Sequence, residues 1–180
     1  MPFEIPAPAP GEPTWPYELY KLLKDAGITQ FSYVPDAGHK VLINLSLADP
    51  DVHSIPLTSE EEGVAMAAGA HLGGQKHVLL MQSSGAGNCI NMLSLPRLGK
   101  FPFLTILSMR GDFGEGNPWQ MPMGKSVQPV LEACDVVCLR VEKPEEVIPT
   151  VEAGLTMAFQ SQESVAVLLS QKLLGAKKFG

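Results

Sequence analysis

The stretch His53–Ala70, HSIPLTSEEEGVAMAAGA, decides the fold because it joins one β-strand to one α-helix. Its apolar beginning, His53–Leu57, predicts a strand, and Ser59 is a favourable N-cap for a helix that starts at the three glutamates. Glu62 stands three residues after Ser59, as in a capping box. Glu60 is therefore expected where strand gives way to helix, which is the edge at which open α/β sheets bind ligands.

The three consecutive glutamates allow two interpretations. All three could simply stabilise the helix start, where the helix dipole favours an ionised carboxylate by roughly 0.3–1 kcal/mol. Alternatively, Glu60 could hold a charge against a buried ligand. The helix that follows consists mostly of glycine and alanine, so a bulky group could approach it closely. The triplet alone leaves both interpretations open, while Glu62 is assigned the capping role.

Strands and helices alternate along the rest of the chain. Short apolar strands separated by helices are typical of an α/β fold, in which an open parallel sheet of six strands is covered by helices on both faces. The runs that predict strands are 28–34, 53–57, 77–82, 103–109, 136–141 and 165–169, and helices are expected at 16–26, 40–48, 86–95, 127–134 and 145–158. Residues 1–13 contain five prolines and are expected to form a flexible segment before a domain at 14–180.

The composition restricts the class of protein. A chain of 180 residues with 45% hydrophobic and 18% charged residues fits one well-packed domain. The net charge of −6, without a basic run, argues against nucleic acid and against an anionic membrane surface as partners, and no apolar run approaches the length of a membrane span. Three widely spaced cysteines, Cys89, Cys134 and Cys138, fit reduced thiols in the cytoplasm better than a disulfide framework or a metal site.

A glycine-rich turn follows the strand expected at 77–82. The sequence Gln82–Asn91, QSSGAGNCIN, lacks the third glycine of the dinucleotide-binding fingerprint and the Gly-Lys-Ser/Thr ending of a Walker A loop. It could be an ordinary tight turn. It could also bind a polar ligand, because it lies at the binding edge of the sheet and gathers several hydrogen-bond donors and acceptors. The candidate ligand-binding residues are Gln82, Ser83, Ser84, Gly85, Gly87, Asn88 and Asn91.

A long loop is expected from Met109 to Lys125, and long loops in compact domains are often binding loops or lids. Arg110 and Lys125 could bind an anionic substrate there, since a guanidinium offers paired N–H donors to a phosphonate, sulfonate or carboxylate. Arg110 could instead pair with Asp112 or Glu115 within the loop. The sequence leaves this choice open.

Together these segments resemble one family, the alpha subunits of sulfopyruvate decarboxylase, and beside them the pyrimidine-binding domain of phosphonopyruvate decarboxylase; both are thiamine-diphosphate enzymes. The resemblance covers most of the chain from residue 16 onwards and rests on Glu60–Ala70, Met81–Asn88, Arg110–Asp112 and Gln120–Gly124. It implies that residues 14–180 form a pyrimidine-binding domain with an open parallel sheet. It also implies an enzyme that decarboxylates a 2-oxo acid, most simply sulfopyruvate to sulfoacetaldehyde and CO2.

In this family a glutamate of the pyrimidine-binding domain hydrogen-bonds ring nitrogen N1′ of the cofactor's aminopyrimidine and activates the cofactor. An alignment without gaps from Ala67–Gly69 places that glutamate at Glu60, which we prefer as the catalytic residue. Alignment on the following glycine would select Glu61. The resemblance further implies cofactor contacts from Gln82, Ser83, Ser84, Gly85, Gly87 and Asn88, and substrate contacts from Arg110, Lys125 and Asn91.

Members of the family hold the cofactor's diphosphate through Mg²⁺ on a second domain, which carries a Gly-Asp-Gly motif followed by an asparagine. This chain has no such motif, because Gly111–Gly114 reads GDFG. The resemblance therefore implies a separate beta subunit that binds the diphosphate and Mg²⁺, in a hetero-oligomer, with a homo-oligomer expected for the isolated chain and no metal ligands in it. Met121 stands where phosphonopyruvate decarboxylases have histidine, which favours sulfopyruvate. Phosphonopyruvate, another anionic 2-oxo acid and a non-catalytic relative remain the alternatives.

Overall fold

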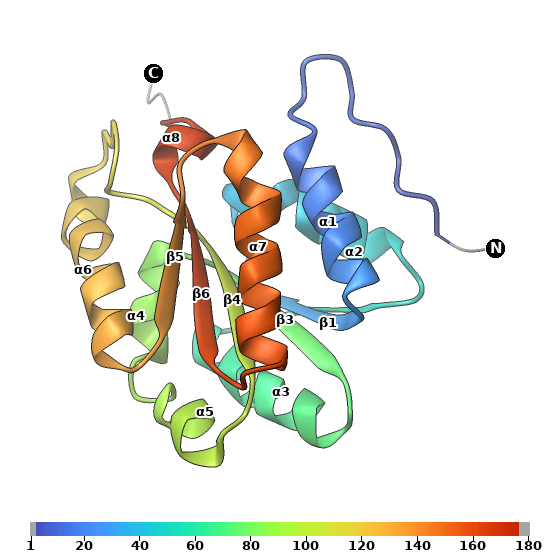
Figure 1. Cartoon of the computed structure of the whole chain (residues 1–180). Coiled ribbons are helices and arrows are strands. Elements are labelled where there is room, and N and C mark those ends of the chain that lie inside the picture. The colour runs from blue at the N-terminus through green and yellow to red at the C-terminus, as the bar shows by residue number, and fades with distance from the viewer. Residues whose placement is uncertain (1–2, 177–180) are drawn as a thin grey trace.

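Six parallel strands form one sheet in the order β2-β1-β3-β4-β6-β5 (Figure 1). The computed structural model describes residues 3–176. The central strands β3, β4 and β6 are almost wholly buried, as expected for a parallel sheet with both faces covered. The strands are β1 (Ile28–Tyr33), β2 (His53–Pro56), β3 (Lys76–Gln82), β4 (Phe103–Ser108), β5 (Val137–Val141) and β6 (Ser164–Leu169).

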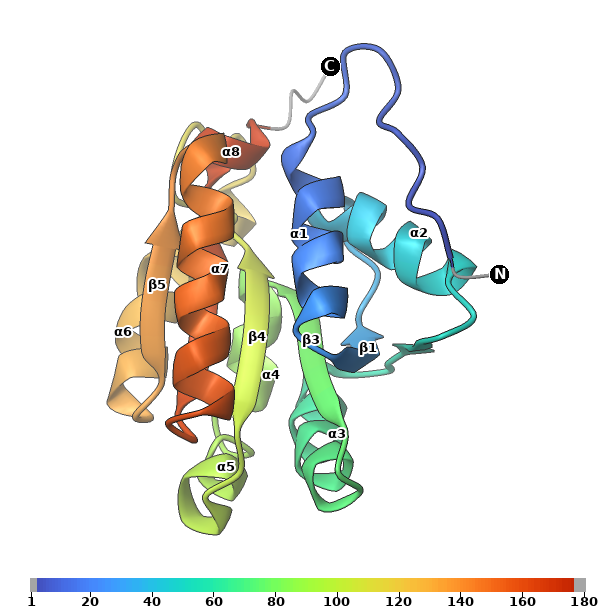
Figure 2. The same cartoon turned by 45° about the vertical axis from the view of Figure 1, so that its right-hand side comes forward.

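Helices cover both faces of the sheet (Figure 2). One core lies under α1 (Trp15–Asp25), α2 (Lys40–Ala48) and α7 (Pro144–Phe159). The other core lies under α3 (Glu60–Leu72), α4 (Ala86–Cys89) and α6 (Met121–Ala133). The remaining short elements are η1 (Ala37–His39), η2 (Ser83–Gly85), α5 (Ser94–Gly99), η3 (Pro118–Gln120) and α8 (Gln171–Leu174). The predicted fold class is therefore confirmed, and each predicted strand lies within one residue of an observed strand at both ends.

The helix predicted at 86–95 is wrong, because it is divided into α4 and α5 with turns between them. Pro96 has no N–H with which to continue the hydrogen bonds of α4, and Leu95 N–H binds the carbonyl of Met92 at 2.9 Å instead. In the first turn of a new helix a proline costs no such bond. A second helix therefore starts at Ser94.

The helix predicted at 127–134 begins earlier than expected, at Met121. Pro122 lies in its first turn, where a proline is tolerated. The loop predicted to reach Lys125 therefore ends before Met121, and Lys125 lies on α6.

The capping box predicted at the start of α3 is wrong in its geometry. The helix does begin at Glu60 after Ser59, but the Ser59 side chain makes no capping hydrogen bond. Glu62 accepts instead from the backbone N–H of Thr58 at 2.9 Å. Its carboxylate thus still stabilises the chain just before the helix.

The small residues of α3 let the sheet approach the helix. A Cβ at Gly63 would lie within 3.0 Å of Leu79 and Ser32, on the strands beneath. Gly69, by contrast, has open space around its Cα. Strands β1 and β3 are therefore the close neighbours of α3 at Gly63. The sequence had suggested a ligand in that place.

Residues 3–13 contain neither helix nor strand. Phe3 nevertheless contacts the edge of the Tyr20 ring, with the ring centroids 6.3 Å apart, and Glu12 accepts a hydrogen bond from Tyr17 Oη at 2.8 Å. The flexibility of this segment and the boundary at residue 14 stay predictions. Within residues 3–176 no helix has the length and apolar character needed to cross a bilayer.

The order in which strands join the sheet changes sides at β1, because β2 lies on one side of β1 and β3 lies on the other. From β1 the chain passes through α2 on one face to the edge strand β2, and then returns through α3 on the other face to β3. The loops that leave β1 and β3 therefore diverge at the carboxyl edge of the sheet, which is where open α/β sheets form binding crevices.

Candidate functional site

Glu60 begins α3 and is buried, with 7% of its surface exposed. Asn88 Nδ2 donates a hydrogen bond of 2.8 Å to Glu60 Oε2. Glu60 Oε1 has no hydrogen-bond partner within residues 3–176. Glu61 and Glu62 are both exposed. The structure thus distinguishes Glu60 from its two neighbours.

Gly85 provides the space that the Glu60 carboxylate occupies. A Cβ at position 85 would collide with Oε1, Cδ and Cγ of Glu60. The backbone of Gly85 has an ordinary helical conformation, with φ −66° and ψ −26°. The requirement for glycine is therefore one of space and not of backbone freedom.

The other polar residues of the glycine-rich turn bond mainly to their neighbours. Gln82 Nε2 donates to Asp36 Oδ1 at 2.9 Å, and Ser84 Oγ donates to Gln82 Oε1 at 2.9 Å. Ser83 is buried and its Oγ accepts from the backbone N–H of Arg110 at 3.0 Å. Gln82 and Ser83 thus join the ends of β1, β3 and β4, beside the turn that holds Glu60.

Asp36 is a residue of this edge that the sequence reasoning missed. Its carboxylate accepts from Ser108 Oγ at 2.5 Å, from Gly38 N–H at 2.8 Å and from Gln82 Nε2. Burial by itself would raise the pKa of Asp36, but these hydrogen bonds outweigh burial and the pKa lies below its ordinary value. The signal available in the sequence was its position, directly after the strand expected at 28–34.

Arg110 pairs with Glu115, which answers the question that the sequence left open. Its Nε and Nη2 donate to the two carboxylate oxygens at 2.6 and 2.7 Å, and both side chains are buried. The pKa of Glu115 falls to about 2, chiefly because of the hydrogen bond from Arg110. Asp112 pairs with Arg140 instead. A guanidinium has five N–H donors, so Arg110 keeps three that have no partner within residues 3–176.

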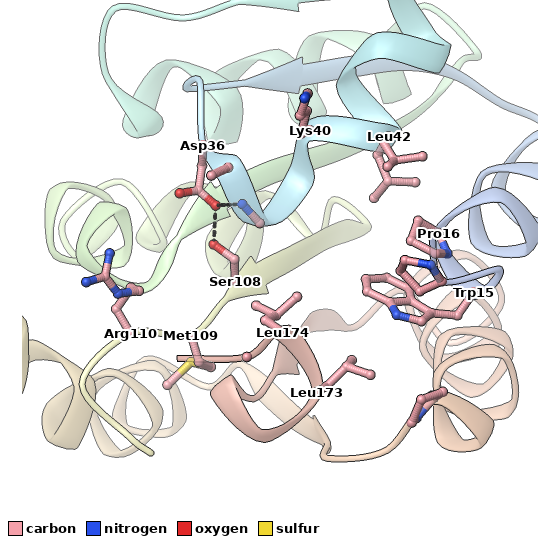
Figure 3. A pocket seen from close by; sticks show the side chains of 16 residues that line it. Trp15, Pro16, Asp36, Lys40, Leu42, Ser108, Met109, Arg110, Leu173 and Leu174 are labelled. Carbon is pink, nitrogen blue, oxygen red and sulfur yellow. Dashed lines mark hydrogen bonds between the residues drawn. The ribbon is translucent and has the colours of Figure 1, made fainter. Parts of the chain in front are cut away.

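A cavity of about 380 Å³ lies at the same edge of the sheet, between the loops after β1 and β4 and the helix α8 (Figure 3). Asp36 and Arg110 lie at one end of it, and Trp15 and Pro16 lie at the other (Figure 3). This volume is within the range of small-molecule sites. The polar lining residues are Asp36, Lys40, Ser108 and Arg110, and the apolar ones include Trp15, Leu42, Leu173 and Leu174.

Not all predicted site residues come together. Lys125 and Asn91 are exposed and do not line the cavity with Arg110. Gly87 lies over Met123, where an added Cβ would be 3.6 Å from the sulfur atom. Among residues 3–176 no group of three or more His, Cys, Asp or Glu side chains is placed to hold a metal ion. The structure therefore gathers Glu60, Gly85 and Asn88 in one place and Asp36 and Arg110 in another, connected by the turn at Gln82.

No protein-family model matches the chain, but curated proteins do. The sulfopyruvate decarboxylase subunit alpha of Methanococcus maripaludis is 38% identical over 84% of this chain and 91% of its own length. The sulfopyruvate decarboxylase of Methanosarcina acetivorans is 32% identical over 89% of this chain but only 41% of its own length. A phosphonopyruvate decarboxylase of Streptomyces viridochromogenes is 36% identical over 66% of this chain and 30% of its own length.

Among solved structures, a 2-oxoglutarate:ferredoxin oxidoreductase from Magnetococcus marinus has a similar fold. It matches 91% of this chain and 29% of its own chain with a TM-score of 0.72. The sequence identity is 18%, so the match concerns the fold alone.

Proposed function

Because this chain belongs to the family of sulfopyruvate decarboxylase alpha subunits, we propose that it is the alpha subunit of a thiamine-diphosphate enzyme. The proposed reaction converts sulfopyruvate to sulfoacetaldehyde and CO2 in the cytoplasm, in keeping with the three free cysteines. The observation that carries the proposal is the buried carboxylate of Glu60, which has one oxygen bound to Asn88 and one without a partner among the described residues.

The residues around Glu60 fit an aminopyrimidine ring. Glu60 Oε1 would hydrogen-bond ring nitrogen N1′ and exchange a proton with it, while Asn88 holds Oε2 and so fixes the plane of the carboxylate. Gly85 leaves the space that the carboxylate needs. Gly87 is a proposed cofactor contact in the same turn. When bound, thiamine diphosphate supplies the nucleophilic carbon and the electron-accepting ring that decarboxylation of a 2-oxo acid needs. Glu61 is exposed, and its position does not support it as the alternative.

A beta subunit would complete the site. This chain corresponds to 41% of the length of the sulfopyruvate decarboxylase of Methanosarcina acetivorans, which leaves room in that protein for a second domain. We therefore assign the diphosphate and Mg²⁺, with the Gly-Asp-Gly motif, to a partner chain. The exposed side chains of Trp119, Met121 and Ile90 suit a contact with such a partner, because α6 packs against α4 next to the Glu60 turn.

Arg110 would bind the sulfonate of the substrate. Its side-on donors are used by Glu115, so the anion would be bound by the remaining N–H groups at the Nη1–Nη2 end. Lys125 and Asn91 remain proposed contacts that would have to be completed by the partner, because neither lines the cavity. Phosphonopyruvate is the second candidate, and the match to a phosphonopyruvate decarboxylase is the observation that favours it.

The test compares this chain purified alone with the complex that it forms with its beta subunit. We expect the isolated chain to bind thiamine diphosphate weakly in calorimetry and to release no CO2 from sulfopyruvate. The complex should bind the cofactor in a Mg²⁺-dependent manner and decarboxylate sulfopyruvate faster than phosphonopyruvate or pyruvate. Tight Mg²⁺-dependent binding by this chain alone would contradict the divided site. An assembled complex without activity on any of these acids would indicate a non-catalytic relative.

A further inference from the structure

Gln171 connects the end of the chain to the Arg110 loop. It is the first residue of α8, is 1% exposed, and uses both ends of its amide. Its Oε1 accepts the backbone N–H groups of Asp112 and Phe113 at 3.0 and 3.1 Å. Its Nε2 donates to Glu115 Oε2 at 3.0 Å. Its own backbone N–H donates to Asp112 Oδ1 at 3.2 Å.

Glu115 is the centre of this network. Besides the two bonds from Arg110 and the one from Gln171, it accepts the backbone N–H groups of Asn117 and Gly111 at 2.9 and 3.3 Å. Its side chain is 1% exposed. A buried carboxylate with five donors has one well-defined orientation, and the guanidinium bound to it side-on shares that orientation. The loop from Arg110 to Asn117 is thus held in one conformation and is not built as a mobile lid.

The network leaves Arg110 partly free at a wall of the cavity. Arg110 lines the cavity together with Leu173 and Leu174, which follow Gln171 in α8. Three of its N–H donors have no partner within residues 3–176. The bonds from Gln171 and from the backbone go to Glu115, and they fix the orientation of its carboxylate. Neutralising the charge of Glu115 would need only Arg110 and none of these bonds.

We propose that Gln171 and Glu115 are positioning residues for the substrate's anionic group. They hold the Arg110 guanidinium so that its unpaired end is available to the sulfonate of a 3-sulfo-2-oxo acid at the polar end of the cavity. This inference rests on the proposed function and extends it from the activation of the cofactor to the recognition of the substrate. It assigns specificity to two residues that touch no substrate themselves.

The experiment compares Gln171→Met and Gln171→Glu in the assembled complex. Gln171→Met removes the bonds to the loop and to Glu115. Gln171→Glu keeps the acceptor for the loop but places a carboxylate against Glu115. For both we expect the KM for sulfopyruvate to rise by about tenfold, the effect of one weakened charged hydrogen bond, with kcat within about twofold of wild type. The inhibition constant of 3-sulfopropanoate, which has the sulfonate without the oxo group, should rise by the same factor, and that of pyruvate should not change.

Tyr20→Phe is the matched control, because it removes a buried hydrogen bond of 2.9 Å to Asp49, and neither of these two residues lines the cavity. It should lower the melting temperature without changing either inhibition constant. A parallel loss for pyruvate and 3-sulfopropanoate, or no change for either, would overturn the positioning role. Hydrogen exchange on the chain alone gives a second readout, since the amides of Asp112 and Phe113 should exchange faster in Gln171→Met. An inactive wild-type complex would overturn the proposed function itself, whereas an active one with unchanged inhibition constants would overturn only this inference.

Discussion

The carboxylate of Glu60 occupies the space that a Cβ at Gly85 would need. The two residues follow different strands of the sheet, Glu60 at the start of α3 after β2 and Gly85 at the end of η2 after β3. Glu60 therefore keeps its place only because residue 85 has no side chain. This relationship can be tested without changing the charge of the site.

Gly85→Ala should displace the Glu60 carboxylate and lower decarboxylation by at least about tenfold, because a carboxylate moved by an ångström no longer meets its proton partner. The fold should persist, since alanine suits the helical backbone of this position. Steady-state kinetics of the assembled complex and circular dichroism give the two measurements. Gly69→Ala is the control, on α3, the helix that Glu60 begins. A Cβ there would meet no other atom of residues 3–176 within 4 Å, so this change should stabilise the protein by up to roughly 1 kcal/mol with unchanged turnover. Equal activity in both variants would contradict the steric argument.

Glu60→Gln should reduce decarboxylation by orders of magnitude, because an amide cannot take up and return the proton that a carboxylate handles. Glu61→Gln and Glu62→Gln should be mild. Glu62→Gln retains an oxygen for the Thr58 N–H, so stability should change by less than about 1 kcal/mol. Exchange of the cofactor's C2 proton for deuterium, followed by NMR after rapid quenching, compares the three variants. Slow exchange in Glu61→Gln alone would place the activating residue one position later.

Arg110→Ala should destabilise the fold by about 3–5 kcal/mol, because it leaves the buried carboxylate of Glu115 without its cation. Urea unfolding measures this loss. The double variant Arg110→Met with Glu115→Met should recover much of it, since no buried charge is then unpaired. Lys21→Ala breaks the exposed pair with Asp25 and should cost less than about 1 kcal/mol. A double variant as unstable as Arg110→Ala would argue against this account.

Stability should fall in mild acid because of His77. Its Nε2 lies 2.7 Å from Ser32 Oγ, and its buried Nδ1 has no hydrogen-bond partner in the described part of the chain. Burial lowers its pKa from 6.5 to about 4. The unfolded chain takes up a proton below pH 6.5 and the folded chain does not. The free energy of unfolding is therefore unaffected by His77 above pH 6.5. It falls by on the order of 3 kcal/mol between pH 6.5 and about 4. Burial also lowers the pKa of His39, which acts in the same direction.

Urea midpoints measured across that range should show the decrease, and His77→Gln should reduce its slope because glutamine does not titrate. Glu115 affects stability in a separate, more acidic pH range. Its pKa of about 2 lies below the ordinary 4.5, so its contribution is present above pH 4.5 and is lost only as the pH falls from 4.5 towards 2. An unchanged slope in His77→Gln would assign the acid sensitivity to other groups.

The sequence by itself determined the strands, most of the helices and the place of Glu60. These features depend on short segments: an apolar run forms a strand, and a small-residue run after Ser59 forms a helix with Glu60 at its start. The predicted helix bounds were wrong in two places. The helix expected at 86–95 is divided before Pro96, and the helix expected from Val127 begins at Met121. The position of Glu60 at the sheet edge followed from its place directly after a strand.

Only the tertiary structure decided which distant residues meet. The sheet order places β6 between β4 and β5, and this brings Gln171 to Glu115, 56 residues earlier in the chain. In the same way Asp36 meets Ser108 across 72 residues. Which strands become neighbours depends on the packing of the whole sheet with its helices, and no local pattern encodes it. For that reason Glu60 could be proposed as a site residue from its own segment, whereas the hydrogen bonds around Arg110 and Glu115 could be found only in the folded chain.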